Sequence, residues 1–374
     1  MLIVGEASGD LHGANLVRAL YQRDPALEIS AVAGEGLKRE KVRVLFDVAR
    51  LTGMGLTELA GNLKALWQAY RLLKKALREE RPDLLILIDF PEFNLRLARL
   101  AKRFKIPVLY YISPQVWAWR PKRIRQIARR VDRMAVVLPF EVPLYEREGV
   151  RASFVGHPLL DVARPTQPRE RTLAQLGLDP SKTTIALLPG SRRQEVAYLL
   201  PTMVEAAERL RRRMDAQFIL ARASTVNRRD LEARLAEATA PVSIIDGNTY
   251  DALHACDLAW TASGTATLET ALMLRPMIIV YRMAWLTYGL ARLLVRVDHI
   301  GLVNIIAGET VVPELLQADV TAERLVKETE AILQDSALRA RIVDKLAEVR
   351  ARLGAPGAAG RVADIALEMM GGRA

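Results

Sequence analysis

The sequence has few of the residues that build disulfides and metal centres. Only one of its 374 residues is a cysteine, Cys256, and four are histidines. A single thiol cannot form an internal disulfide or a cysteine-rich zinc site, so a reducing compartment is the expected environment. Long apolar runs without charge are also lacking, because the longest candidate span, 277–297, contains three arginines that would be costly in hydrocarbon. We therefore expect neither a disulfide scaffold nor a transmembrane helix.

Several widespread catalytic motifs are missing as well. The sequence contains no G-x-x-x-x-G-K-[ST], no G-x-G-x-x-G after its first apolar run, no G-x-S-x-G and no H-E-x-x-H. It has no Asp-x-Asp pair to hold a divalent metal between phosphates. No basic segment or cleavage site comes before the first apolar residues, which predicts no signal peptide. We expect a protein without a metal or a bound cofactor.

The composition is that of an ordinary globular protein with a basic surface. Hydrophobic residues make up 51% of the chain, charged residues 26% and aromatic residues 6%. The 54 lysines and arginines against 43 acidic residues give a net charge of +11. Such a surface attracts phosphates, anionic lipid or nucleic acid, and charge alone does not choose among them.

Short apolar runs alternate with segments of helical periodicity. In the first half, runs at 84–88 and 108–112 flank a helical segment, and the same rhythm restarts after the polar, proline-bearing stretch 164–169. In the second half we predict strands at 184–188, 218–221, 242–245, 258–260 and 277–280. Continuous apolar strands between helices indicate parallel sheets covered on both faces.

The sequence therefore predicts an α/β fold with two Rossmann-like, doubly wound domains that face a central cleft. We place the first domain at 1–165 and the second at 166–355. A last helix at 356–374 crosses back to the first domain or to a partner chain, and the sequence does not decide between these. Ligands of such sheets bind beyond the carboxyl ends of the strands.

Two turns in the second half are suited to binding an anion. After strand 184–188, Gly190 can bring its own amide and that of Ser191 close to a ligand, and Arg192 can hold phosphate in a bidentate way. After strand 258–260, Ser263, Gly264 and Thr265 open another helix. Each turn alone is explained as well by helix capping, but the two together favour an anion site.

Glu269 lies about one turn into the helix that follows the second of these turns. The helix dipole favours a carboxylate there, and the same group could accept hydrogen bonds from two ribose hydroxyls. An anion site beside a group that binds a diol would fit the phosphates and the ribose of a nucleoside diphosphate. Arginine, amides and helix dipoles, rather than magnesium, would then neutralise the leaving group.

In the first half, Asp89 directly follows a strand and is surrounded by aromatic residues and proline. Desolvation there would raise its pKa and suit a general base, although Asp89 could instead only order the turn. Glu92 is a competing base unless it caps the next helix. In the opening turn we expect Asp10 to be the N-cap of a helix at 11–23, with Glu6 and Ser8 facing the same cleft.

Two further features keep alternative interpretations. His157 is more often packed and hydrogen-bonded than catalytic. The segment 56–77 has an apolar face, a basic face and Trp67 at the border, so it fits a helix packed on the sheet as well as a helix resting on anionic lipid. The stretches 113–130 and 282–288 add tryptophans and basic residues, but no nucleic-acid-binding motif is present, so we expect no nucleic-acid partner.

Six motifs occur in the order found in the lipid-A-disaccharide synthase family, which this chain resembles over nearly its whole length. They are Gly5-Glu6-Ala7-Ser8-Gly9-Asp10, 88–94, Ser113-Pro114-x-x-Trp117-Ala118-Trp119-Arg120, 188–192, 263–269 and 304–308. The first and third are specific to the family, whereas the Pro-Gly-Ser-Arg turn in 188–192 is not.

The resemblance implies a GT-B glycosyltransferase at the cytoplasmic face of the inner membrane. It would join UDP-2,3-diacylglucosamine to 2,3-diacylglucosamine 1-phosphate in a β-1,6 linkage, with inversion and release of UDP. By motif, Asp89 resembles the base for the acceptor 6-hydroxyl, Arg192 and Asn304 resemble donor-side residues, and Glu269 resembles the ribose ligand. Where the family commonly has a second aspartate after Asp89, this chain has Glu92.

The resemblance also implies a homodimer in which the C-terminal segment is exchanged, placing Asn304 in a partner's site. Three other functions stay open. A UDP-N-acetylglucosamine 2-epimerase or another GT-B transferase would share the nucleotide half, and a peripheral lipid- or RNA-binding module would use the basic surface without catalysis.

Overall fold

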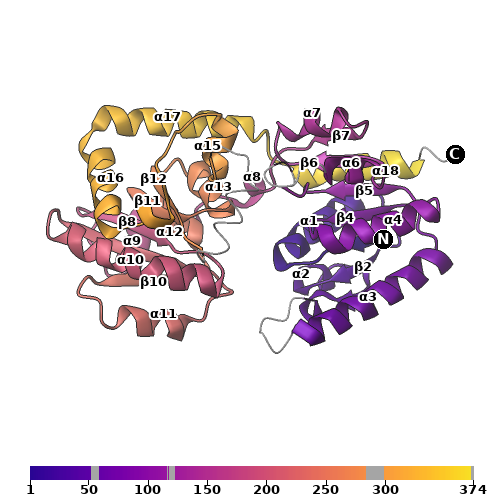
Figure 1. Ribbon diagram of the computed structural model, residues 1–374, viewed down its shortest axis with the longest axis horizontal. Coiled ribbons are helices and arrows are strands. Elements are labelled where there is room, and N and C mark those ends of the chain that lie inside the picture. The colour runs from indigo at the N-terminus through magenta and orange to yellow at the C-terminus, as the bar shows by residue number, and fades with distance from the viewer. Residues whose placement is uncertain (52–58, 116, 118–122, 284–298, 372–374) are drawn as a thin grey trace. The chain divides into compact units, whose positions relative to one another are not determined.

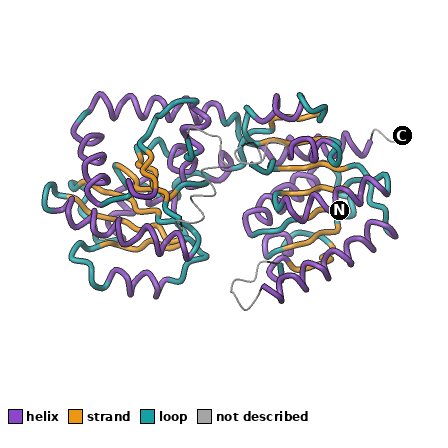
Figure 2. Tube along the Cα trace, in the orientation of Figure 1, coloured by secondary structure: helices purple, strands orange, loops and turns teal. Residues whose placement is uncertain are grey.

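The computed structural model describes residues 1–51, 59–115, 117, 123–283 and 299–371. The chain forms two compact units, the first made of Met1–Asp161 and Leu353–Ala374 and the second of Val162–Arg352. Each unit contains one sheet whose described strand pairs are all parallel, with helices on both faces (Figures 1 and 2). This is the α/β architecture with two doubly wound domains that the alternation of apolar runs and helical segments predicted, and it fits the GT-B fold that the family resemblance implies.

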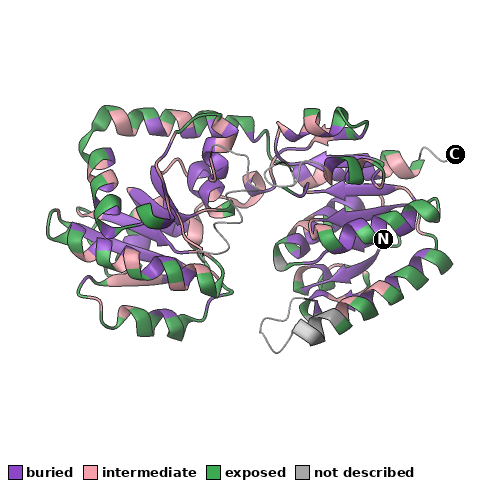
Figure 3. Cartoon of the chain, in the orientation of Figure 1, coloured by how far each residue is buried: buried purple, intermediate pink, exposed green. Residues whose placement is uncertain are grey.

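Unit 1 is built on a seven-stranded sheet of order β3-β2-β1-β4-β5-β6-β7. Its strands are β1 (Leu2–Ile3), β2 (Ser30–Ala33), β3 (Arg43–Asp47), β4 (Leu85–Ile88), β5 (Val108–Tyr111), β6 (Arg133–Val136) and β7 (Arg151–Phe154). Its helices are α1 (Ala7–Arg23), α2 (Glu35–Lys38), α3 (Leu59–Glu79), α4 (Pro91–Arg103), α6 (Ile124–Ala128), α7 (Glu141–Glu146) and α18 (Ala358–Gly371), and α8 (Leu159–Val162) lies at the unit boundary. The central strands β4 and β5 are buried throughout because their apolar side chains are covered on both faces (Figure 3).

Unit 2 is built on a six-stranded sheet of order β10-β9-β8-β11-β12-β13. Its strands are β8 (Thr183–Leu188), β9 (Ala216–Arg222), β10 (Val242–Asp246), β11 (Leu258–Ala262), β12 (Met277–Tyr281) and β13 (Glu314–Leu316). Its helices are α9 (Arg169–Gln175), α10 (Arg193–Arg211), α11 (Arg228–Leu235), α12 (Thr249–Ala255), α13 (Thr265–Leu272), α15 (Leu302–Ala307), α16 (Ala322–Gln334) and α17 (Ser336–Arg352).

The last helix, α18, packs against α1 and belongs to unit 1. Asp364 of α18 pairs with Arg23 of α1 at 2.5 Å, and Glu368 pairs with Arg133 of β6 at 2.6 Å. The guanidinium of Arg361 donates to the Val155 carbonyl at 2.8 Å. The C-terminal residues therefore complete the helical cover of the first sheet.

The strand orders place the topological switch points where sequence analysis placed the candidate residues. In unit 1 the chain winds outward from β1 to β2 and β3, then returns to start β4 on the other side of β1. Unit 2 repeats this pattern with β8 and β11. Ligands of open parallel sheets bind at such points, beyond the carboxyl ends of the two central strands. The turns after β1, β4, β8 and β11 are therefore the expected ligand-binding positions.

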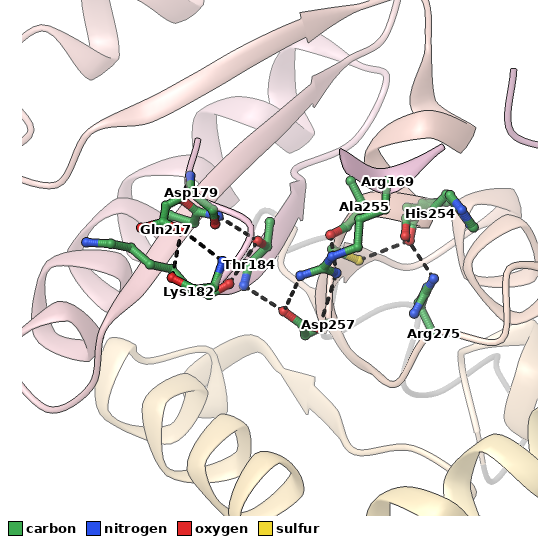
Figure 4. A network of polar contacts seen from close by, with 12 residues as sticks. Arg169, Asp179, Lys182, Thr184, Gln217, His254, Ala255, Asp257 and Arg275 are labelled. Carbon is green, nitrogen blue, oxygen red and sulfur yellow. Dashed lines mark hydrogen bonds and ion pairs between the residues drawn. The ribbon is translucent and has the colours of Figure 1, made fainter. Parts of the chain in front are cut away.

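At the amino ends of its strands, the second sheet carries a network of polar contacts (Figure 4). Asp257, just before β11, accepts a bidentate pair from Arg169 at 3.2 Å and a bond from the Thr184 amide at 2.8 Å. The side-chain amide of Gln217 donates to the Thr184 hydroxyl at 2.9 Å and to the Asp179 carbonyl at 2.7 Å. These bonds tie the amino ends of β8, β9 and β11 together, which is a structural role.

The prediction that Asp10 caps a helix at 11–23 is wrong. Helix α1 begins at Ala7, and Asp10 lies inside its first turn, where its amide donates to the Glu6 carbonyl. The Asp10 carboxylate instead accepts from the amides of Gly34, Gly36 and Leu37, at 2.7, 2.6 and 3.2 Å. Asp10 thus anchors the turn between β2 and α2 to α1, a long-range contact that local helix signals do not reveal.

Helix α3 covers most of the segment with the apolar and basic faces. Leu73 and Leu77 are buried together with Ala69, so this part of the helix packs on the sheet. Trp67 is 58% exposed, and the Arg71 guanidinium lies 4.6 Å from its ring centre. Leu56 lies outside the described residues. None of the described helices is long and apolar enough to cross a bilayer.

Candidate active site

Asp89 stands at the switch point of unit 1 in a constrained backbone. Its φ of 48° and the φ of 47° at Phe90 are left-handed, which costs on the order of 1–3 kcal/mol per residue without glycine. The Asp89 carbonyl accepts from the Tyr110 hydroxyl at 2.5 Å and from the Asn94 side-chain amide at 2.7 Å. The surrounding strands and helix therefore fix how the carboxylate leaves the end of β4.

Burial raises the pKa of the Asp89 carboxyl, as its aromatic neighbours predicted. The negative charge of Glu6, on the turn after β1, raises this pKa further, and a hydrogen bond from the Phe90 amide opposes the rise. A carboxylate with a raised pKa takes up a proton more readily near neutral pH, which is the property of a general base. Glu6 and Asp89 are thus brought together by the two central strands. Ser8 is exposed on the first turn of α1.

Gly5 is needed for the close approach of the two turns. A Cβ atom built at Gly5 would lie 2.0 Å from Cγ of Phe90, so any larger residue would displace the Phe90 ring. Because Phe90 shares its left-handed turn with Asp89, Gly5 helps to set the position of the carboxylate. Glycine is thus needed at this position because it lacks a side chain, and not for its conformational freedom.

Glu92, the competing base, is paired with an arginine. It lies in the first turn of α4, where its two oxygens contact Arg123 at 2.5 and 2.7 Å. Because Glu92 is held in an ion pair and burial raises the pKa of Asp89, Asp89 stays the candidate for the base.

In unit 2, the turn after β8 binds a carboxylate of its own chain. Glu195 Oε2 accepts from the amides of Ser191 and Arg192, at 3.1 and 3.2 Å. Gly190 has a φ of 114°, and a Cβ there would lie 2.5 Å from the same oxygen. Of the two amides expected to face phosphate, that of Ser191 is thus engaged by Glu195, a residue in the first turn of α10. The Arg192 guanidinium contacts Glu195 Oε1 at 3.5 Å, but its side chain is 80% exposed and is the candidate group for binding an anion.

The turn after β11 leaves a helix N-terminus without a side-chain cap. Gly264, with a φ of 138°, is the N-cap of α13, and Thr265 is its first residue. Within this described turn, Ser263 donates to the Ile300 carbonyl at 3.1 Å. The Tyr250 hydroxyl donates to Glu269 at 2.9 Å, and burial raises the pKa of the Glu269 carboxyl. The positive end of α13 and a partly buried carboxylate therefore lie within two turns of one helix.

Asn304 is wholly buried on α15 and its side chain is saturated with hydrogen bonds. Its amide group donates to the Val312 carbonyl and to Glu314 at 2.9 and 2.8 Å, and its oxygen accepts from the amides of Val311 and Val312. Glu314 in turn accepts from the Ile300 and Gly301 amides, at 2.9 and 3.1 Å. Ser263, in the turn after β11, donates to the carbonyl of the same Ile300. Asn304 is therefore connected to this turn through Glu314 and Ile300. Nothing in the sequence indicated the role of Glu314.

A second buried carboxylate that sequence analysis missed lies beyond β5 and β6. Glu141, 1% exposed on α7, accepts from the Trp117 indole at 3.2 Å and from the Leu138 amide at 3.3 Å. Burial raises the pKa of Glu141 to about 7, against the opposing effect of hydrogen bonds from Ser113, Trp117 and the backbone. Glu141 thus anchors the first tryptophan of the Ser-Pro-x-x-Trp-Ala-Trp motif. Trp119 lies outside the described residues.

We expect stability to fall as pH rises through the titration of Glu141. The folded state holds the Glu141 proton more tightly than the unfolded state, so unfolding becomes easier between pH about 4.5 and about 7, by roughly 3 kcal/mol in total. Glu141→Gln should remove this decline, which denaturant unfolding below and above the window would measure. Glu146→Gln, an exposed change on the same helix, should keep it. An unaltered pH dependence in Glu141→Gln would contradict the prediction.

His12 and His157 of unit 1 are packed side chains rather than catalytic ones. Burial lowers the pKa of both His12 and His157 to about 4, so both are neutral near pH 7. His157 Nδ1 accepts from the Leu159 amide at 3.2 Å, and the His157 amide donates to the Leu353 carbonyl at 2.9 Å. The structural interpretation of His157 is therefore the better one. Among the described residues, no group of three or more histidine, cysteine or acidic side chains could hold a metal ion.

The chain is similar to known proteins in both sequence and fold. Residues 1–356 match the model of the lipid-A-disaccharide synthetase family. The lipid-A-disaccharide synthase of Syntrophus aciditrophicus is 50% identical over 99% of this chain and 97% of its own length. A glycosyltransferase of kitacinnamycin has a similar fold, with a TM-score of 0.65 at 16% identity and coverage of 98% of each chain.

A UDP-GlcNAc 2-epimerase from Neisseria meningitidis, solved with UDP-GlcNAc bound, has a TM-score of 0.61 at 11% identity and covers 100% of this chain and 99% of its own. At such low identity these two structures show the fold alone, and the fold does not separate transferase from epimerase. The family match does separate them, because it spans both units and all the candidate turns. The chain belongs to the lipid-A-disaccharide synthetase family.

Proposed function

We propose that this protein is a lipid-A-disaccharide synthase. It transfers the sugar of UDP-2,3-diacylglucosamine to the 6-hydroxyl of 2,3-diacylglucosamine 1-phosphate, inverts the anomeric carbon and releases UDP. Family membership supports the activity, and one structural observation supports the chemistry. At the switch points of the two sheets, unit 1 presents a carboxylate of raised pKa, and unit 2 presents an exposed arginine and an uncapped helix N-terminus.

In the proposed mechanism, unit 1 supplies the base and unit 2 holds the donor. Asp89 removes the proton of the acceptor hydroxyl while its oxygen bonds to the anomeric carbon, and the bond from that carbon to UDP breaks. Arg192 and the N-terminus of α13, with Ser263, Gly264 and Thr265, stabilise the charge on the departing diphosphate. Glu269 accepts hydrogen bonds from the ribose. Asn304 acts as a positioning residue, through Glu314.

The acceptor and donor both carry acyl chains, so we place the enzyme at the cytoplasmic face of the inner membrane as a peripheral protein. The net charge of +11 and the exposed Trp67 beside Arg71 support contact with anionic lipid. In an exchanged homodimer, α18 would make with the partner the contacts to α1 that it makes here within one chain.

We expect UDP release only when the diacylated donor and the diacylated acceptor phosphate are both present. Omitting each in turn, with UDP measured enzymatically, tests the transferase. Since positive side chains and helix dipoles stabilise the leaving group in this scheme, activity should survive EDTA. An epimerase would convert UDP-N-acetylglucosamine without acceptor, and a lipid- or RNA-binding module would release no UDP from any mixture. Loss of activity on chelation, restored by magnesium, would overturn the metal-free mechanism.

A further inference from the structure

The family-specific motif at 113–120 has no part in the proposed chemistry, and neither has the buried carboxyl group of Glu141. The motif directly follows β5, the strand next to β4 in the first sheet. Glu141 is the first residue of α7, which packs on β6 and β7 (Figure 1). Of the motif, the structure describes 113–115 and Trp117, and Glu141 forms hydrogen bonds with Ser113 and with Trp117. The two unused features are therefore in direct contact.

The turn after β5 starts beside Asp89. Strands β4 and β5 pair in parallel with Ile88 opposite Tyr111, and the Asp89 amide donates to the Tyr111 carbonyl at 3.3 Å. The next residue, Ile112, has a φ of 63°. A left-handed backbone is unfavourable for a β-branched residue, so the surrounding contacts must hold it there. Both strand ends, at Asp89 and at Ile112, are therefore constrained at the edge of the sheet where ligands bind.

Glu141 holds the half-buried Trp117. The Trp117 indole donates to Glu141 Oε1 at 3.2 Å, while Glu141 Oε2 accepts from the Leu138 amide at 3.3 Å. The indole ring also stands edge-on against Phe140, with ring centres 4.9 Å apart. Because Glu141 is 1% exposed, water cannot replace these hydrogen bonds when the carboxyl group is removed. The position of Trp117 thus depends on one carboxyl group and one aromatic ring.

The same carboxyl group also holds the start of the turn. The buried Ser113 side chain forms a hydrogen bond with Glu141, and its oxygen lies 2.7 Å from the Tyr145 hydroxyl. Tyr145 is 1% exposed and, like Glu141, belongs to α7. Helix α7 therefore fixes the turn after β5 by polar contacts at two points, Ser113 and Trp117.

We propose that Glu141 is a positioning residue for the acceptor: through Trp117 and Ser113 it fixes the turn after β5 as one wall of the acceptor site. This inference rests on the proposed function, because it takes Asp89 as the base. A sugar that presents its hydroxyl to Asp89 lies at the carboxyl end of β4, and the end of β5 is adjacent. Aromatic side chains held in place by polar contacts are typical walls of such sites.

Substitutions that remove the hydrogen bond between residues 141 and 117 should raise the KM for the acceptor about three- to tenfold, the usual contribution of one such bond. Glu141→Leu leaves the indole without its partner, and Trp117→Phe removes the indole donor but keeps an aromatic ring. The KM for the UDP donor and kcat should stay within about twofold of the wild type, because Asp89 and unit 2 are unchanged. The double substitution should raise the acceptor KM no further than either single one, because both remove the same bond.

Two further variants separate positioning from general loosening. Burial raises the pKa of Glu141 to about 7, so in mildly acidic solution the group is mostly a neutral carboxyl, which glutamine resembles. In Glu141→Gln the side-chain oxygen can still accept from the indole and from the Leu138 amide, so the acceptor KM should stay close to that of the wild type. Val150→Ala is the matched control, since it removes buried apolar volume just after the same helix. It should lower stability and leave the acceptor KM unchanged.

An acceptor KM that stays unchanged in Trp117→Phe, or that Val150→Ala raises as much, would overturn the proposal. So would a donor KM that rises as far as the acceptor KM. If Glu141→Leu fails to fold, Trp117→Phe decides alone, because its ring is only half-buried. If no protein releases UDP, the proposed function fails. The affinity for the diacylated acceptor phosphate, measured by calorimetry in detergent, then decides the role of Glu141 with the same variants and the same expected ratios.

Discussion

Asp89→Asn should lose between about a hundredfold and ten-thousandfold of turnover and keep its affinity for UDP. This range is the usual contribution of general-base catalysis. The side-chain amide of asparagine cannot act as the base, because it does not take up the proton of the acceptor hydroxyl. Asn is nearly isosteric with Asp, and its side-chain oxygen can still accept from the Phe90 amide. The carbonyl and amide of residue 89 keep their hydrogen bonds to Asn94, Tyr110 and Tyr111. The measurements are UDP release at saturating substrates and UDP binding by calorimetry.

The pH profile gives this prediction a second readout. The wild-type rate should rise with pH through the raised pKa of Asp89, because only the ionised form accepts a proton, and Asp89→Asn should lack that rise. Glu92→Gln is the matched control, since it removes the nearby carboxylate that Arg123 already holds. Near-normal turnover in Asp89→Asn, or a loss confined to Glu92→Gln, would take the role of base away from Asp89.

Strands can be predicted from the sequence where their apolar runs are long enough to be recognised. The runs at 84–88 and 258–260 correspond to β4 and β11, because strands buried on both faces have continuous apolar sequences. Strands such as β2 and β6 are not evident in this way. They have four residues each, and each begins with a polar residue, Ser30 or Arg133, although the sheet buries both.

The turns of the candidate site are also predictable, but their internal geometry is not. A strand, small residues and a helix place Gly190 and Gly264 at strand ends. The left-handed backbone at Asp89 depends on the Tyr110 hydroxyl of β5, and the occupied amides after β8 depend on Glu195 of α10. Such contacts come from other elements or from side-chain conformations, which a linear pattern does not contain.

Asn304 illustrates the difference between a motif and a role. The family motif marks the residue as part of the donor side, and nothing in the sequence says whether it touches a ligand. In the structure its side chain is buried and all four of its hydrogen-bonding positions are used within unit 2. The link through Glu314 to Ile300 favours positioning of the turn after β11 over contact with substrate.

Asn304→Ala should lower the free energy of unfolding by about 3–5 kcal/mol. It leaves the amides of Val311 and Val312 and the Val312 carbonyl without their partner in a buried site, and each such group costs about 1–3 kcal/mol before the structure relaxes. Denaturant unfolding measures the loss. Asn248→Ala, an exposed asparagine at the start of α12 whose side chain makes no capping bond, should change stability by less than about 0.5 kcal/mol.

A double-mutant cycle with Glu314→Gln tests the connection itself. Because the Asn304 amide donates to Glu314 at 2.8 Å, the two substitutions should be non-additive by about 0.5–3 kcal/mol. At a temperature where Asn304→Ala is folded, the loosened segment at Ile300 and Gly301 should raise the KM for the UDP donor more than it lowers kcat. The opposite result would be an Asn304→Ala protein that is as stable as the wild type, is additive with Glu314→Gln and releases no UDP. Asn304 would then have to touch the substrate. Its burial in unit 2 would belong to a state other than the active one.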